Sequence, residues 1–389
     1  MSHAAASCYV VVAPGLEGLV AAELRALGIV PGAVEPGGVN FQATAPEIFR
    51  TNLHLRTASR ILVRIAEFRA TAFHELDRLA RGVPWETFVE AGGAARLRVS
   101  CRKSRLYHSD GVAERVAGAI TRRVKGVTIA GAPRDDDEED VVAETAQLFA
   151  VRFHHDVCTI SADASGALLH RRGYRQATAK APIRETLAAA LLLALEWDGG
   201  VPLVDPMCGA GTIAIEAALL ARRIPPGLTR DFACEQWPAA PAKEFAALRD
   251  AARDRTLPAA PAPILASDRD AGAIDAARAN AARAGVAGDV AFTQQPLSAA
   301  TGRGGRGGRG VIVTNPPYGA RVGERTALRS LYAQLGNVAR AKFAGWTLAF
   351  IAADRVLEGQ VKLPLAEVIR FKNGGIPVRL VRAEVPARD

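Results

Sequence analysis

The chain has 389 residues, of which 49% are hydrophobic and 23% are charged, so it is not a disordered protein and is too long for one ordinary domain. We therefore expect two or three domains with hydrophobic cores. The formal net charge of +9 favours a polyanionic partner such as nucleic acid, although a basic enzyme without such a partner is also consistent with it.

The cysteines and the apolar runs indicate a protein of the reducing cytoplasm. The five cysteines lie far apart and none forms a C-x-x-C pair, so the sequence predicts no zinc or other metal site and no disulfide framework. The first residues lack the charged start and long apolar stretch of a leader, and the apolar runs elsewhere are too short to cross a bilayer. We expect no membrane association.

The first half of the chain predicts small α+β modules. A strand over residues 8–15 precedes a helix over residues 16–27, and short β-like stretches then alternate with helical ones. Residues 96–125 hold nine Arg or Lys against two acids. Clustered basic side chains suit a phosphate backbone, and the alternative is a solvated basic helix face.

The second half predicts an α/β domain with a mostly parallel sheet. The expected strands cover residues 202–205, 264–267, 290–293, 311–314 and 346–351. A hairpin follows at Asn373-Gly374, because Asn-Gly is the strongest short hairpin signal. Two segments interrupt the pattern: residues 225–263 are rich in Ala and Pro, and the glycine-arginine loop at 302–310 is either a surface insertion or an RNA-contacting arm.

A ligand site is predicted where the strand at residues 202–205 ends. Asp205 is followed by a turn with Gly209 and Gly211 and by a helix that begins near Thr212. In an open parallel sheet, ligands bind beyond the carboxyl ends of the strands, where glycines let backbone N–H groups approach them. No Gly-Lys-Ser/Thr follows, which excludes a P-loop, but the glycine spacing satisfies a loose dinucleotide pattern.

Two acids at strand ends favour S-adenosylmethionine as the ligand. Asp205 can hold the cationic amino-acid end of that molecule and would repel a pyrophosphate. Asp268 ends the next strand, where a carboxylate can accept hydrogen bonds from both ribose hydroxyls of an adenosine. The acid lies much further from the glycines than in dinucleotide enzymes, but the inserted segment can explain this, so spacing does not decide. Both acids could instead be plain strand-end or cap residues.

The tetrapeptide Asn315-Pro316-Pro317-Tyr318 directly follows the strand at 311–314. The prolines fix the backbone so that its carbonyls point outward, and the Asn315 side-chain oxygen and the Pro316 carbonyl can together accept both hydrogens of an exocyclic amine. Tyr318 offers a ring on which an extruded base can stack. This predicts methyl transfer to a base amine, and the alternative is a proline-rich turn without chemistry.

The segments "DPMCGAGT" and "NPPY" together resemble the class I S-adenosylmethionine-dependent methyltransferases that act on amino nitrogens. The stretches "VSCRKSRLYHSDGVAERV", "DASGALLHRRGYR", "FACEQW" and "FKNGGIPVRL" are similar to the THUMP-containing RNA methyltransferases, over nearly the whole chain. The resemblance is closest to the bacterial branch that methylates N2 of a guanine in 23S ribosomal RNA.

This resemblance implies a domain order and a set of site residues. It implies a ferredoxin-like domain at 1–60, a THUMP RNA-binding domain at 61–165, and a Rossmann-like methyltransferase domain with a seven-stranded mostly parallel sheet at 166–389. The implied base-binding and catalytic residues are Asn315, Pro316, Pro317 and Tyr318. The implied cofactor-binding residues are Ala181, Pro182, Asp205, Pro206, Cys208, Gly209, Gly211, Thr212, Asp268, Arg269 and Asn315. The predicted RNA-binding residues are Arg102, Lys103, Arg105, Arg172 and Arg175.

One position departs from the family pattern, and several functions stay open. The family usually has an acid after the third strand that meets the adenine amine; Pro296 stands there, and Gln294 or Gln295 could accept that hydrogen bond instead. Methylation of guanine N2 in tRNA, adenine N6 in DNA or glutamine N5 in protein could use the same tetrapeptide, and the basic first half favours RNA. The alternatives of another class are a non-catalytic RNA-binding assembly protein and a nicotinamide-dependent oxidoreductase.

Overall fold

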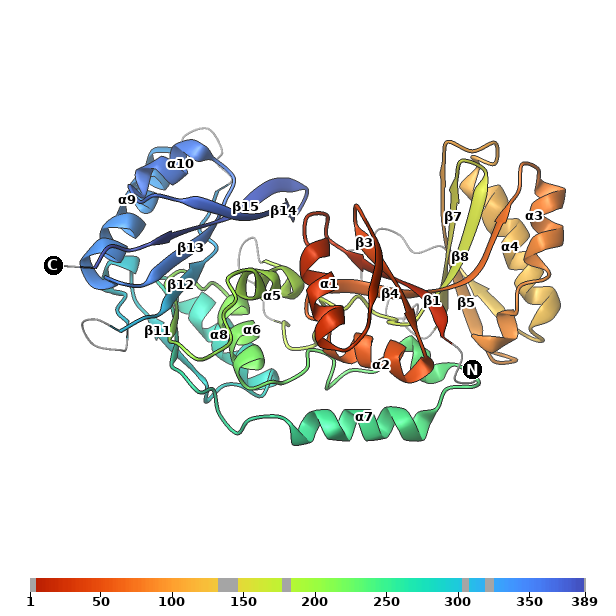
Figure 1. Ribbon diagram of the computed structural model, residues 1–389, viewed down its shortest axis with the longest axis horizontal. Helices are drawn as coiled ribbons and strands as arrows, with labels where there is room; N and C mark the ends of the chain where they lie inside the picture. The colour runs from red at the N-terminus through yellow and green to blue at the C-terminus, as the bar shows by residue number, and fades with distance from the viewer. Residues whose placement is uncertain (1–4, 132–145, 177–182, 303–307, 319–324, 388–389) are drawn as a thin grey trace. The chain divides into compact units, whose positions relative to one another are not determined.

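The computed structural model describes residues 5–131, 146–176, 183–302, 308–318 and 325–387. The chain divides into two compact units (Figure 1). Unit 1 comprises Met1–Val12, Val20–Leu169 and Arg230–Asp250, and unit 2 comprises Ala13–Leu19, His170–Thr229 and Ala251–Asp389. The predicted catalytic half is therefore not one continuous stretch of sequence.

Within the described residues, unit 1 is built on an eight-stranded sheet in the order β2-β3-β1-β4-β8-β7-β5-β6. Its elements are β1 (Ala6–Val12), α1 (Glu17–Ala26), β2 (Pro31–Glu35), β3 (Gly38–Ala43), α2 (Ala45–His54), β4 (Ala58–Arg69), α3 (Phe73–Ala80), η1 (Trp85–Thr87), β5 (Ala94–Arg102), α4 (Ser109–Arg123), β6 (Thr128–Ala130), β7 (Gln147–His154) and β8 (Val157–Asp163). The first six strands and helices follow the βαββαβ order of a ferredoxin-like module.

The boundary predicted between residues 60 and 61 lies inside β4. Residues 58–63 of this strand pair with β1, and residues 62–69 pair with β8, all antiparallel. One long strand therefore serves both N-terminal modules. A buried ion pair between Arg60 of β4 and Asp163 at the end of β8 joins them further. The sequence could not show this, because a strand of alternating burial looks the same whichever neighbours it pairs with.

The middle of the inserted segment of the second half, residues 230–250, belongs to unit 1. The segment contains η3 (Ala233–Gln236) and α7 (Ala242–Asp254). Trp237 Nε1 donates a hydrogen bond to Gln147 Oε1 at 2.8 Å, and the Cys234 amide donates to the carbonyl of Ala164 at 3.1 Å. The Phe245 ring stacks on Phe49 of α2, with centroids 4.5 Å apart. The domain predicted at 166–389 therefore lends residues 230–250 to the N-terminal unit.

The described part of unit 2 forms a seven-stranded sheet in the order β11-β10-β9-β12-β13-β15-β14. Its elements are α5 (Glu185–Ala194), β9 (Leu203–Asp205), α6 (Thr212–Ala221), β10 (Ile264–Asp268), α8 (Ala271–Arg283), β11 (Val290–Gln294), η4 (Leu297–Ala299), β12 (Val311–Thr314), α9 (Arg325–Lys342), β13 (Thr347–Ala352), α10 (Arg355–Gln360), β14 (Ala366–Asn373) and β15 (Ile376–Glu384). The five strands from β11 to β13 are parallel, and β15 pairs antiparallel with both β13 and β14. The predicted mostly parallel sheet with an added hairpin is confirmed.

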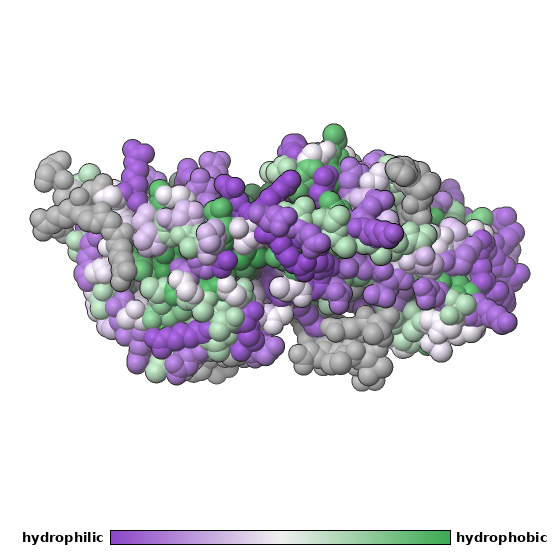
Figure 2. Space-filling model, turned by 90° about the horizontal axis from the view of Figure 1, so that it is seen from below, coloured by the Kyte–Doolittle hydropathy of each residue, from purple (hydrophilic) through white to green (hydrophobic). Residues whose placement is uncertain are grey.

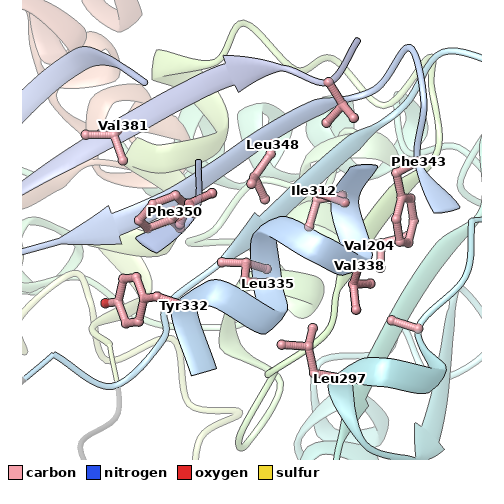
Figure 3. Close-up of a cluster of buried hydrophobic side chains, with 14 of the residues drawn as sticks. Val204, Leu297, Ile312, Tyr332, Leu335, Val338, Phe343, Leu348, Phe350 and Val381 are labelled. Carbon is pink, nitrogen blue, oxygen red and sulfur yellow. The ribbon is translucent and has the colours of Figure 1, made fainter. Parts of the chain in front are cut away.

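The amphipathic helix α9 packs on one face of this sheet. Its residues Tyr332, Leu335 and Val338 lie in one buried cluster with Ile312 of β12 and Phe350 of β13 (Figure 3). Burying a large apolar side chain of this kind contributes about 1.5–3 kcal/mol. This packing fixes β12, the strand that leads into the Asn-Pro-Pro-Tyr tetrapeptide.

The surface is mainly polar where it is seen. Hydrophilic residues cover much of the face drawn in Figure 2, with hydrophobic residues between them. Among the described residues, no helix combines the length and the hydropathy that a membrane span requires.

Candidate active site

The predicted site residues meet at one edge of the unit 2 sheet. β9 pairs in parallel with β10 on one side and with β12 on the other. These three neighbouring strands end at Asp205, Asp268 and Thr314. The next strand along the chain, β10, lies on one side of β9, and the later strand β12 lies on its other side. The carboxyl edge at β9 is therefore the topological switch point at which such sheets bind ligands.

The glycine turn after β9 has a conformation that requires glycine. Gly209 and Gly211 have φ values of +53° and +83°, in the left-handed region. A Cβ atom on Gly211 would lie 3.0 Å from the Ala277 Cβ and 3.1 Å from the Phe292 ring. The turn is thus held close to α8 and β11, and α6 begins directly after it at Thr212.

Asp205 is buried, and half of its carboxylate lacks a partner. Its Oδ1 accepts hydrogen bonds from Thr314 Oγ1 at 2.8 Å and from the Met207 amide at 3.3 Å. Its Oδ2 is buried, and nothing in the described part of the chain donates a hydrogen bond to it. Burial raises the pKa of Asp205 to about 7, with a smaller contribution from the nearby negative charge of Asp268. Leaving such an oxygen unpaired is unfavourable, so a cationic ligand group would fit here.

Asp268 is held by backbone amides. Its Oδ2 accepts a hydrogen bond from the Gly209 amide and its Oδ1 one from the Asp270 amide, each at 3.0 Å. The carboxylate is only half-buried and keeps lone pairs for a ligand. Asp270 caps α8, since its Oδ1 accepts a hydrogen bond from the Ala273 amide at 3.1 Å.

The tetrapeptide contributes a second unpaired oxygen, at the end of the neighbouring strand β12. Asn315 directly follows Thr314, whose hydroxyl donates to Asp205, and its Oδ1 is buried with no hydrogen-bond partner among the described residues. Pro316 is buried and Pro317 is exposed. Tyr318 is half-buried, and its hydroxyl accepts a hydrogen bond from Asn373 Nδ2 at 2.6 Å. An amide oxygen without a donor can accept an N–H from a ligand.

Three site residues escaped the sequence analysis, namely Thr314, Asn280 and Asn373. Thr314 donates to Asp205 Oδ1 and so links the end of β12, just before Asn315, to the end of β9. Asn280, fully buried on α8, donates from Nδ2 to the Ala210 carbonyl at 3.1 Å and so holds the glycine turn. A buried Asn on a helix is the one signal that could have pointed to it, because such a side chain needs partners.

The other predicted cofactor residues have mixed outcomes. Ala181 and Pro182 lie outside the described residues. Pro206 is buried beside Asp205, and Arg269 is exposed. Burial raises the pKa of the Cys208 thiol, which therefore stays neutral. At the departure from the family pattern, Pro296 precedes η4, and the side chain of Gln294 is exposed.

Arg172 and Arg175 are paired with buried acids. The Arg172 side chain is 3% exposed, and its Nε lies 3.5 Å from Glu216 Oε1. Arg175 Nε lies 3.1 Å from Glu185 Oε1. Their guanidiniums are thus engaged by acids on α5 and α6, and their binding of RNA stays a prediction. A short basic run in a sequence does not reveal such internal partners.

The other basic residues divide into paired and exposed sets. Arg122 and Arg123 of α4 form ion pairs with Asp77 and Glu86. Arg102 is the last residue of β5, and Lys103 and Arg105 follow it. All three are exposed and form no ion pair within the described part of unit 1. Among the predicted RNA-binding residues, these three are therefore the ones that are exposed and form no ion pair with a described residue. Within the described residues there is also no group of three or more His, Cys, Asp or Glu that could hold a metal.

Comparisons with known proteins identify the family of the chain. The model of the RMKL-like methyltransferase domain matches residues 172–382, and that of the RlmL ferredoxin-like domain matches residues 7–62. Ribosomal RNA large subunit methyltransferase K/L of Syntrophotalea carbinolica is 37% identical over 95% of this chain and 52% of its own length. The chain thus spans about half the length of this relative. The slr0064 protein of Synechocystis, provisionally named an RNA methyltransferase, is 32% identical over 97% of this chain and 96% of its own length.

Solved structures match over the whole chain. A Clostridium difficile protein described as a possible methylase has 30% identity and a TM-score of 0.83, covering 99% of both chains. SMU.472, crystallised in complex with SAH, has 28% identity and a TM-score of 0.85, again covering 99% of both chains.

Sheet order, glycine turn and strand-end acids together define a methyltransferase of the class that uses S-adenosylmethionine. The chain belongs to the family of the RMKL-like methyltransferase domain, which confirms the predicted resemblance. Family membership rules out the nicotinamide-dependent alternative. The ferredoxin-like module is confirmed by its own match, and the THUMP assignment of residues 61–165 stays a prediction.

Proposed function

We propose that this protein transfers a methyl group from S-adenosylmethionine to the exocyclic N2 amine of a guanine in 23S ribosomal RNA. The observation that carries the proposal is the pair of buried oxygens at neighbouring strand ends. Asp205 Oδ2 and Asn315 Oδ1 both lack a hydrogen-bond donor among the described residues, and Thr314, the residue before Asn315, donates to the other oxygen of Asp205. One oxygen suits a cation and the other suits an amine.

The residues around Asp205 fit the methyl donor. When bound, S-adenosylmethionine supplies an electrophilic methyl group on a sulfonium. Asp205 would hold its ammonium group, Asp268 would accept from the ribose hydroxyls, and the turn at Gly209 and Gly211 leaves room for the ligand to approach the backbone. Pro206, Cys208, Thr212 and Arg269 complete the proposed surround, and Ala181 and Pro182 remain predictions.

The residues after β12 fit the base. The lone pair of a guanine amine is delocalised into the ring, which makes it a poor nucleophile. Asn315 Oδ1 and the Pro316 carbonyl would accept its two N–H groups and turn the lone pair toward the methyl group, while the base stacks on Tyr318. Because the donor is already activated, this positioning supplies most of the rate enhancement.

Ribosomal RNA is the favoured substrate for two reasons. The relative from Syntrophotalea carbinolica carries that activity in its name. The net charge of +9 and the exposed Arg102, Lys103 and Arg105 suit an RNA backbone. A cytoplasmic location follows from that substrate and belongs to the proposal.

The test is incubation with labelled S-adenosylmethionine and either 23S rRNA or tRNA, followed by mass-spectrometric mapping of the modified nucleotide. We expect label on guanine N2 of the rRNA. Label on tRNA would move the proposal to the other substrate. Donor binding without label on any RNA would favour the non-catalytic assembly protein.

Replacing Arg102, Lys103 and Arg105 together with alanine should weaken RNA binding and flatten its salt dependence. Each lost phosphate contact lowers the slope of log K against log salt by about 0.7–0.9, so a loss of up to about 2–3 is expected. Binding titrations at several salt concentrations measure it. The variant with Arg122→Ala and Arg123→Ala, whose guanidiniums are already paired, is the control. An unchanged slope in the triple variant would return the loop to an ordinary solvated surface.

A further inference from the structure

The turn of the β14–β15 hairpin lies at the same edge of the sheet as the proposed site. β13 runs parallel to β12, and β15 runs antiparallel to both β13 and β14. β14 therefore points in the direction of β12, and its last residue, Asn373, emerges at the edge where β12 ends at Thr314. The topology thus brings residues from the end of the chain to the tetrapeptide.

The hairpin also extends beyond its neighbour. The last residue of β13, Ala352, is paired with Arg379, and Arg379 pairs in turn with Arg370 of β14. β14 continues for Phe371, Lys372 and Asn373 past that point, which is about 10 Å of extended chain. Consequently the hairpin tip overhangs the carboxyl edge of the sheet.

The tip is stiff. Asn373 is paired with Ile376, and the two residues between them, Gly374 and Gly375, both have positive φ values, +56° and +81°. That is the tight two-residue turn which matches the twist of paired strands. Phe371, two residues before Asn373, is buried and anchors the base of the tip. The Asn373 side chain therefore starts from a fixed backbone position.

From this position the Asn373 side chain contacts Tyr318. Its Nδ2 lies 2.6 Å from the Tyr318 hydroxyl oxygen and donates to it, across 55 residues of sequence. A half-buried ring tethered at its hydroxyl has fewer orientations than one held only at Cβ, so less of its freedom is lost when a base binds to it. A ring whose orientation is fixed before binding can stack on an extruded base without first being ordered.

We propose that Asn373 is a positioning residue, which acts through the Tyr318 hydroxyl to orient the ring on which the target base stacks. This inference rests on the proposed function, because it takes Tyr318 as the base-stacking residue. The hydrogen bond itself is independent of that assignment and can be tested separately.

The test is a double-mutant cycle with Asn373→Ala, Tyr318→Phe and the double variant. Tyr318→Phe keeps the ring and removes only the hydroxyl. We expect Asn373→Ala to lower kcat/KM for RNA about 3- to 10-fold, as the loss of one hydrogen bond implies, with the affinity for S-adenosylmethionine unchanged by calorimetry. In the Tyr318→Phe background the same replacement should have no further effect. Asn337→Ala, an exposed asparagine on α9, is the control.

Thermal unfolding of the same four proteins gives a readout without turnover. The Tm shifts of the two single variants should not add in the double variant, because both remove one hydrogen bond. Additive Tm shifts, or a full kcat/KM effect of Asn373→Ala in the Tyr318→Phe background, would overturn the inference. A wild-type protein without activity on any RNA would refute the proposed function instead, and the Tm cycle would still decide whether Asn373 holds Tyr318.

Discussion

Replacement of Asn315 by alanine is expected to reduce the rate of methyl transfer by about 10²- to 10³-fold, the size of effect seen when a preorganised hydrogen-bonding group at a reacting centre is removed. The buried Oδ1 has no donor among the described residues, and in the proposed mechanism its partner is the base amine. The affinity for S-adenosylmethionine should change by less than about twofold, because we propose that Asn315 binds the base and that Asp205 binds the donor. Single-turnover assays and calorimetric titration measure the two quantities.

A control variant, and the comparison of turnover with donor affinity, make this result specific to Asn315. Asn337→Ala makes the same chemical change on the exposed surface of α9 and should leave both quantities near the wild-type values. Equal losses of turnover and donor affinity in Asn315→Ala would contradict the assigned role, since they would indicate collapse of the edge shared with Thr314 and Asp205.

Replacement of Asp205 by asparagine is expected to lower the affinity for S-adenosylmethionine about 10- to 100-fold, because a charge-assisted hydrogen bond contributes about 1.5–3 kcal/mol. In the wild-type protein the affinity should rise between pH 6 and pH 8. Burial raises the pKa of Asp205 to about 7, and only the ionised carboxylate pairs with an ammonium group. Calorimetry across that pH range measures both effects.

The same shift has a consequence for the ligand-free protein. The folded-state pKa of Asp205 lies above the ordinary value for an aspartate, so folding favours the protonated form. Its contribution to stability is therefore full below about pH 4 and is lost as the pH rises through 7. Asp205→Asn should remove this slope from the pH dependence of Tm. Asp270→Asn is the control, because asparagine caps a helix as well as aspartate does. A wild-type donor affinity that stays flat from pH 6 to pH 8 would exclude the proposed role of Asp205.

Local sequence was enough to predict the strands of unit 2 and one side of the site. Apolar runs that end in Asp205, Asp268 or Thr314 identify strand ends, and parallel strands with helical connections bring those ends to one edge. The backbone freedom of glycine predicted the binding turn after β9. The backbone restriction of proline predicted the role of the Asn-Pro-Pro-Tyr tetrapeptide after β12. These predictions hold because each depends on residues close together in the chain.

Contacts between distant residues could not be predicted in the same way. Trp237 meets Gln147 from 90 residues away, and this contact assigns residues 230–250 to the N-terminal unit. The sequence shows Arg172 and Arg175 as part of a basic run. Only the structure shows that they pair with Glu216 and Glu185. A side chain's charge is readable from the sequence, but its burial and partner are not.

The sequence by itself determined the methyltransferase class, the parallel sheet with its hairpin, and the residue types needed at the sheet edge, because period, turn chemistry and strand-end position are local properties. Only the tertiary structure decided that β4 serves two modules, that Thr314 and Asn280 hold the site in place, and that Asn373 reaches Tyr318. The physical reason is that a buried polar group must find its partner in space, and the chain brings that partner from whichever segment the packed sheet places beside it.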